Sequence, residues 1–84
     1  MILEGTVKKS KEYWLVEVPA IDLMTQGKTR GEALDMIIDA VETLVDKPGF
    51  KVGIHDRRKN VIGVWSDDAQ AFMDLMLERG KKRE

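Results

Sequence analysis

The sequence predicts an α+β domain in which helices pack against an antiparallel sheet. Residues 13–18, YWLVEV, form the densest run of aromatic and β-branched residues in the chain, and such runs are typical of strands. Between residues 30 and 46 the apolar residues recur at helical spacing instead. Short polar stretches separate the first two strand-like runs and the last two, which favours hairpins between neighbouring strands.

The strands are expected at residues 2–7, 13–18, 23–26, 50–55 and 61–65. Pro19 has no backbone N–H and therefore ends the second strand. Side chains alternate between the two faces of a strand, so Glu17 is expected to face solvent, opposite Val16 and Val18.

The first helix is expected over residues 30–46. Thr29 and Glu32 have the spacing of a capping box, in which each residue accepts a hydrogen bond from the backbone N–H of the other. Pro48 disfavours the helical conformation at the residue before it, and Gly49 completes the end of the helix.

A second helix is expected over residues 67–79, with Ser66 as its N-cap. Its apolar residues cover a wide arc, made of Ala69, Phe72, Met73, Leu75, Met76 and Leu77. Two interpretations of this arc stay open. It belongs to the core of a small domain, or part of it is buried, with Trp65, between copies of the chain in a homo-oligomer.

The composition narrows the class of protein. The 84 residues suit one domain over 1–84, with a core at about 1–65 and a helix with a basic tail at about 66–84. The absence of cysteine and the single histidine exclude disulfides, a thiolate nucleophile and a His-rich metal site. The sequence lacks the apolar core of a signal peptide and any apolar run of membrane-spanning length. We therefore expect a cytoplasmic protein with no cofactor and no metal site.

One side of the first helix is expected to be strongly acidic. At about 100° per residue, five carboxylates fall within a wedge of roughly 80°: Glu32, Asp35, Asp39, Glu42 and Asp46. No Lys or Arg interrupts this segment. The acids form either a solvated face that keeps the protein soluble or a docking surface for a basic partner, and the missing basic residues favour docking.

Part of the chain resembles the HicB family of antitoxins. The shared pattern is an aromatic-rich strand ending in Val-Pro, a Thr-x-Gly-x-Thr turn, and Glu-Ala-Leu at the start of a helix. The matching elements are Trp14, Val18-Pro19, Thr25-Gln26-Gly27-Lys28-Thr29 and Glu32-Ala33-Leu34, within residues 13–42. Lys28 departs from the family pattern, in which this position is often acidic.

The resemblance implies a truncated RNase H-like domain with strand–strand–strand–helix–strand order, here with an added strand and a C-terminal helix. It implies an antitoxin that binds and inhibits a small basic HicA-like ribonuclease, which cleaves mRNA, by masking its RNA-binding surface and catalytic histidine. The residues expected to contact this toxin are Asp35, Asp39, Glu42 and Asp46. HicB-like proteins are commonly dimers or tetramers, so a homo-oligomer is expected.

Two other functions are weighed against this one. A metal-dependent nuclease needs converging carboxylates, but Glu4 and Glu17 lie on different strands and the helix acids point away from the sheet. His55 and Asp56 are adjacent on a strand and point to opposite faces, so no enzyme activity and no catalytic residue are expected. The runner-up is an oligomeric transcriptional regulator that binds operator DNA through its basic C-terminal region. That region contains Arg79, Lys81, Lys82 and Arg83.

Overall fold

The computed structural model describes residues 1–80 of the chain. Within them, strands and α-helices follow in the order β1 (Ile2–Ser10), β2 (Tyr13–Val18), β3 (Leu23–Gly27), α1 (Arg30–Val45), β4 (Gly53–Arg58), β5 (Val61–Trp65) and α2 (Ala69–Gly80). A short 3-10 helix, η1 (Pro19–Ile21), connects β2 to β3. The fold is α+β, as the sequence predicts.

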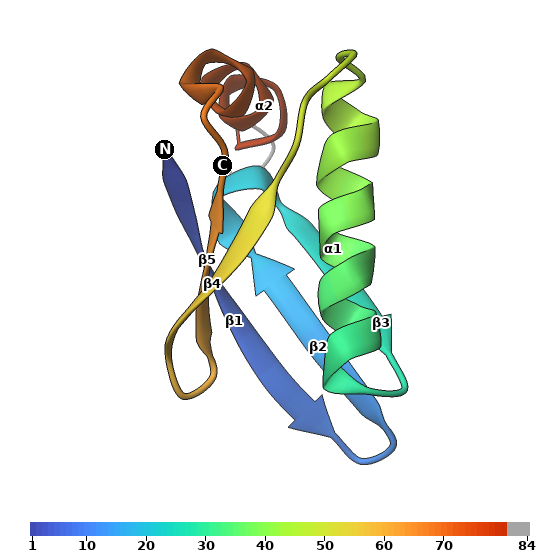
Figure 1. Cartoon of the computed structure of the whole chain (residues 1–84). Helices are drawn as coiled ribbons and strands as arrows, with labels where there is room; N and C mark the ends of the chain where they lie inside the picture. Colours follow the sequence, from blue (N-terminus) through green and yellow to red (C-terminus); the bar gives the residue numbers. More distant parts are fainter. Residues whose placement is uncertain (81–84) are drawn as a thin grey trace.

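The five strands form one antiparallel sheet in the order β3-β2-β1-β5-β4 (Figure 1). β1 lies in the middle, where Thr6 is opposite Glu17 of β2 and Val61 of β5. The β4–β5 hairpin therefore completes the sheet of its own chain. β3 and β4 are left as the two edges of the sheet.

β1 continues to Ser10, whereas the sequence predicts an end at Val7. Lys8 and Lys9 are paired with residues of β2, and the turn begins only at Lys11, whose φ is 42°. These lysines are exposed, so their polar side chains reach water while their backbone stays in the ladder. A polar stretch was therefore not sufficient to locate the end of the strand.

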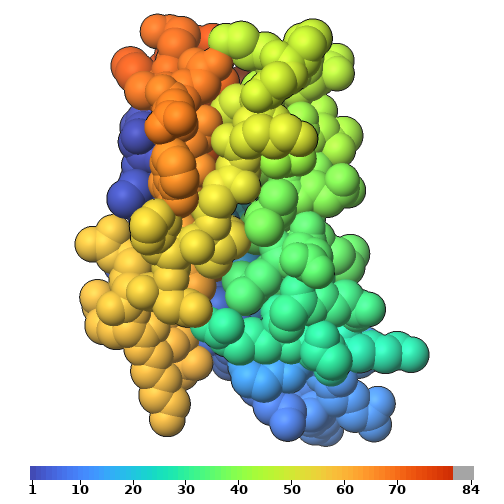
Figure 2. All heavy atoms as spheres, viewed as in Figure 1, coloured from blue at the N-terminus to red at the C-terminus, as the bar shows by residue number. Residues whose placement is uncertain are grey.

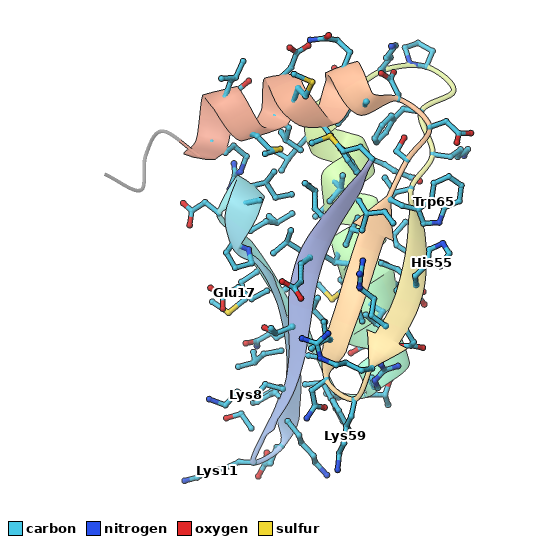
Figure 3. All side chains as sticks on the ribbon, turned by 90° about the vertical axis from the view of Figure 1, so that its left-hand side faces the viewer. Lys8, Lys11, Glu17, His55, Lys59 and Trp65 are labelled. Carbon is cyan, nitrogen blue, oxygen red and sulfur yellow. The ribbon has the colours of Figure 1, made fainter. Side chains whose placement is uncertain are left out.

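The face of the sheet that meets α1 is apolar. Its buried side chains are Leu3, Val7, Val16, Val18, Ile62 and Val64. α1 adds Ala33, Ile37 and Val41 to the same core. Glu17 points to the other face and is exposed, as predicted. Figure 3 looks onto that other face, with α1 behind the strands.

The capping of α1 agrees with the sequence prediction at one hydrogen bond and differs at the other. Thr29 Oγ1 accepts from the backbone N–H of Glu32 at 3.0 Å, as predicted. Glu32 Oε1 accepts from the N–H of Lys28 at 2.7 Å, and not from that of Thr29. α1 ends at Val45 because Asp46 adopts the left-handed conformation with a φ of 50°.

Gly27 allows the first turn of α1 to lie directly on the end of β3. A Cβ at this position would be 2.7 Å from the backbone nitrogen of Ala33 and 3.0 Å from the Cβ of Glu32. Thr25 Oγ1 donates to the carbonyl oxygen of Ala33 at 2.9 Å. The Thr-x-Gly segment therefore joins the start of α1 to the edge of the sheet.

β4 begins later than the sequence predicts, because it covers Gly53–Arg58 and not residues 50–55. Phe50 lies before the strand and enters the core, where its ring meets the ring of Phe72 edge-on at a centroid distance of 6.0 Å. A register shift near Arg58 marks a β-bulge in the pairing of β4 with β5. The alternation of apolar residues around Phe50 thus reflects packing in the core and not strand pairing.

α2 begins at Ala69, and Asp68 caps it, not Ser66 as the sequence predicts. Asp68 Oδ1 accepts from the N–H of Ala71 at 3.1 Å. Ser66 Oγ accepts from the N–H of Asp68 at 3.0 Å, so it fixes the turn before the helix. Both residues have N-cap chemistry, and only the geometry of the turn decides between them.

α2 packs against η1 and closes one end of the core (Figure 1). Phe72 and Leu75 are buried there, and Met76 packs partly against the core. Phe72, Leu75 and Met76 of the wide apolar arc therefore belong to the core of this chain, while Ala69, Met73 and Leu77 stay exposed. Neither α-helix of the described residues is long and apolar enough to cross a membrane.

Candidate partner-binding surface

The acidic stripe, defined as Asp35, Asp39, Glu42 and Asp46, lies on α1 and at its C-terminal end. The apolar positions Ala33, Ile37 and Val41 hold the opposite side of the helix against the sheet. Asp35, Asp39 and Asp46 are exposed. In Figure 2, α1 is the green ridge on the right-hand side of the molecule. Asp35 and Asp39 thus present exposed carboxylates along one side of the helix, and Asp46 adds a third just beyond its end.

Glu42 differs from the other members of the stripe. It is half-buried, and its Oε2 accepts from the backbone N–H of Val52 at 3.1 Å. Val52 lies in the segment between α1 and β4, so this bond ties that segment to the helix. Glu42 therefore has a structural task within the chain, which its position on a helical wheel did not predict.

Two ion pairs lie at the ends of α1, and neither of them involves the acidic stripe. Arg30 Nη2 is 2.6 Å from Asp56 Oδ1 at the start of the helix. Lys47 pairs with Asp68 just beyond its end. No ion pair within residues 1–80 involves Asp35, Asp39 or Asp46. Their negative charge is therefore not neutralised by a basic side chain of the described part of the chain.

Lys47 also holds the pKa of Asp68 below its ordinary value. The hydrogen bond from the Lys47 ammonium is the largest cause, and the backbone N–H of Ala71 contributes in the same direction. Both donors stabilise the charged carboxylate. The side chain that caps α2 is thus also an anchor for the loop that follows α1.

Of the residues predicted to bind nucleic acid, only Arg79 lies within the described part of the chain. The guanidinium of Arg79 donates to the carbonyl oxygens of Ile21 and Asp22, at 2.7 and 2.9 Å, so it holds α2 against the end of η1. Lys81, Lys82 and Arg83 lie outside the described residues. Arg79 therefore has a structural role within the chain.

A group of basic residues at the hairpin end of the sheet was missed at the sequence level. The backbone N–H of Val7 donates to the carbonyl oxygen of Asn60 at 3.0 Å, so the tip of the β4–β5 hairpin lies beside β1. This end, which we call the basic end, carries Lys8, Lys9, Lys11, Arg57, Arg58 and Lys59. Figure 3 shows Lys8, Lys11 and Lys59 projecting from it. Because the two runs lie some 50 residues apart in the sequence, only the antiparallel register brings them together.

The uncovered face of the sheet holds the single histidine. His55 and Trp65 lie side by side with their rings edge-to-face at a centroid distance of 5.7 Å (Figure 3). Asp56 is engaged by Arg30, so His55 and Asp56 do not form a pair, as predicted. No group of three His, Asp or Glu side chains in the described residues is arranged to hold a metal ion.

A hollow of about 480 Å³ opens between the loop after α1 and the turn before α2. Phe50, Trp65 and the paired Lys47 and Asp68 are among its lining residues. It gathers no set of nucleophile, base and oxyanion donors within the described residues that could carry out a reaction.

Comparison with known proteins adds no relative. The chain matches no protein-family model, and no curated protein and no solved structure gives a significant match to it.

Proposed function

We propose that the chain is an antitoxin-type protein of the HicB-like kind, which binds and inhibits a small basic HicA-like mRNA-cleaving ribonuclease. In this proposal the sheet and α1 are a truncated RNase H-like domain. The acidic stripe occupies the positive surface on which the toxin would otherwise hold RNA phosphates, so the toxin can no longer bind its substrate.

One observation carries the proposal. Asp35, Asp39 and Asp46 point outward and form no ion pair within the described residues, although the chain as a whole has nearly equal numbers of basic and acidic residues, 14 and 15. Like charges along one side of a helix oppose its formation by a few tenths of a kcal/mol per pair, about 0.2–0.5. A surface with both acidic and basic residues would keep the protein soluble without that cost. Binding of a basic partner explains why the stripe contains acidic residues only.

The experiment is co-expression with the protein encoded by the adjacent gene, followed by co-purification and a growth-rescue assay. If the two proteins bind, the stripe variant Asp35→Asn, Asp39→Asn, Asp46→Asn is compared with Glu12→Gln, Glu17→Gln, Asp67→Asn. Both triple variants remove three exposed carboxylates, so their net charges are equal.

The stripe variant should bind the toxin about 10- to 100-fold more weakly and with a shallower dependence on salt, because close charge pairs at an interface are worth about 1.5 kcal/mol or more. The control variant should bind like the unmodified chain. Equal weakening by both variants would show that only net charge matters, and unchanged binding by the stripe variant would refute the docking surface.

A second candidate function is nucleic-acid binding, which we place at the basic end and not at Arg79. The tip of the β4–β5 hairpin lies beside β1 at Val7, and both hairpins turn at this end of the sheet, so their cations can contact phosphates of one backbone. A gel shift with DNA from upstream of the gene tests this candidate. Lys59→Ala should weaken the complex and reduce its salt dependence by about one unit, whereas Lys51→Ala, an exposed lysine before β4, should not.

A further inference from the structure

Among residues 1–80, β3 is an edge strand without the usual protection against pairing with another strand. It pairs with β2 on one side only and ends the sheet order. Its sequence, LMTQG, contains no charged residue and no proline, and its register with β2 has no bulge. Proteins commonly protect a sheet edge with one of these features. The other edge, β4, has both charged residues and a bulge.

Exposed apolar side chains flank β3 on both faces of the sheet. Met24 lies on the uncovered face and is 59% exposed. On the other face, α1 lies over β3 and β2. One side of this helix faces the loop before β4, where Glu42 accepts its hydrogen bond from Val52. Met36 and the half-buried Ala40 lie on the opposite side of the helix, towards the free edge of β3. Met36 is 46% exposed. The open backbone is thus bordered by methionine side chains, which adapt well to a partner surface.

We propose that β3 is the seam of a symmetric homodimer, in which β3 of one copy pairs antiparallel with β3 of a second copy. The two five-stranded sheets then become one continuous sheet of ten strands. The seam buries Met24 and Met36 of both copies and gives hydrogen-bond partners to the backbone groups on the free side of β3.

The chemistry of β3 favours a second copy of this chain as the occupant. Thr25 is the central residue of the strand, so symmetric pairing places it opposite its own copy and places Met24 opposite Gln26 of that copy. No like charges meet between the two β3 strands, because the strand carries none. Self-pairing of β4 would instead bring its aspartate, histidine and arginines against one another.

The symmetry also brings the two α1 helices together. The two-fold axis between antiparallel strands is perpendicular to the sheet, so both helices lie on the same face. Since α1 lies over β3 and β2, the helices are about two strand spacings apart, about 10 Å. This is a normal distance between packed helices, and it places Met36 and Ala40 of each copy toward the other.

The oligomeric state of the purified chain tests the seam directly. Sedimentation equilibrium at concentrations from about 1 to about 300 µM should show an average mass that rises from that of a monomer towards that of a dimer. A five-residue strand with one helix flank is at the small end of specific interfaces, so we expect a dissociation constant on the order of 10–100 µM. A chain that stays monomeric over the whole range would overturn the proposal.

The chain offers closely matched controls. Met24 and Met36 are 59% and 46% exposed, and Leu77 and Met73 on α2 are 60% and 48% exposed. The double variant Met24→Lys, Met36→Lys should be monomeric, with unchanged circular dichroism. The double variant Met73→Lys, Leu77→Lys should dimerise like the unmodified chain. The reverse pattern would assign self-association to α2 and refute the seam.

A cross-link tests the register. The chain contains no cysteine, so the double variant Met24→Cys, Gln26→Cys has only these two thiols. Opposed residues of antiparallel strands have Cα atoms about 4.5–5.5 Å apart, which suits a disulfide. Mild oxidation should give a covalent dimer in much higher yield than from His55→Cys on β4. Equal yields would contradict the proposed pairing. None of these measurements involves a toxin, so the seam and the proposed function can fail independently.

Discussion

Gly27 is the residue whose absence of a side chain matters most for the start of α1. Its Cβ would meet the backbone nitrogen of Ala33 at 2.7 Å, and backbone cannot rotate away as a side chain can. We therefore expect Gly27→Ala to lower the free energy of unfolding by about 1–3 kcal/mol. Urea denaturation measures the effect.

The matched control is Gly31→Ala, in the first turn of α1, where an added Cβ has no heavy atom within 4 Å. Alanine is the better helix former, so this variant should be unchanged or up to about 1 kcal/mol more stable. Equal losses for both variants would contradict the close contact at Gly27.

Glu42 and Asp39 should respond differently to the same substitution, although both belong to the acidic stripe. Glu42→Ala leaves the half-buried N–H of Val52 without its acceptor and should cost about 1–3 kcal/mol in unfolding free energy. Asp39→Ala removes an exposed carboxylate without a partner in the described residues and should change stability by less than about 0.5 kcal/mol.

The measurement for this pair is thermal or urea unfolding of the two variants beside Glu42→Gln, which keeps an acceptor oxygen. Toxin binding should show the opposite order, with the larger loss for Asp39→Ala. If Glu42→Ala proved as stable as Asp39→Ala, the hydrogen bond from Val52 to Glu42 would not contribute to the free energy of unfolding.

The start of α2 should make stability depend on pH in the acid range. The Lys47 ammonium and the backbone N–H of Ala71 lower the pKa of Asp68 in the folded chain. A carboxylate with a lowered pKa stabilises the fold above its unfolded pKa, and this stabilisation is lost as the pH falls through the lowered value. The window therefore lies below the ordinary aspartate value of 3.8.

The difference in unfolding free energy between the unmodified chain and Asp68→Asn tests this dependence. It should be constant from about pH 7 to about pH 5 and shrink as Asp68 becomes protonated at lower pH. Asp67→Asn, an exposed neighbour, is the control. A difference that does not change down to about pH 2 would show that the charge of Asp68 has no role.

The boundaries of helices and strands were predicted best where residues close in the sequence determine them. β2 and β5 were predicted to the residue, because β-branched and aromatic runs bounded by polar turns define them. The wrong boundaries lie at the end of β1, at both ends of β4 and at the cap of α2. Strand pairing and packing decide the boundaries of β1 and β4, and the geometry of the turn before the helix decides the cap of α2. Phe50, for example, alternates like a strand residue but packs against Phe72.

The acidic stripe was predictable for the same reason, since a helical period places its members on one side. The bond from Val52 to Glu42 was not predictable, because it depends on the path of the loop after α1. The basic end was missed because it needs the β1–β5 register, which no local pattern contains. A charged surface on a single helix could thus be predicted from the sequence, whereas a charged surface built from two separate hairpins could not.

For the sheet as a whole, its strand order predicts a hierarchy of local stability. β1 is paired on both sides, whereas β3 and β4 are paired on one side only. In dilute solution, amide hydrogens of the paired β1 should exchange at the rate of global unfolding, and those of β3 should exchange earlier through local opening. Hydrogen exchange followed by NMR measures both.

Raising the protein concentration should slow exchange in β3 but not in β4, if β3 is the seam of a dimer. Equal behaviour of the two edges would count against the seam. Faster exchange in β1 than in β3 would contradict the strand order itself.

The central position of β1 has a consequence for synthesis. β1 leaves the ribosome before the other strands of the sheet, and its neighbour β5 follows only after β2, β3, α1 and β4. A nascent chain can form the β1–β2–β3 meander early, but one side of β1 stays uncovered until β5 has been translated. A prematurely terminated polypeptide would therefore leave one backbone edge of β1 unpaired and its buried residues Leu3 and Val7 less covered, and we expect such fragments to be targets for chaperones and proteases.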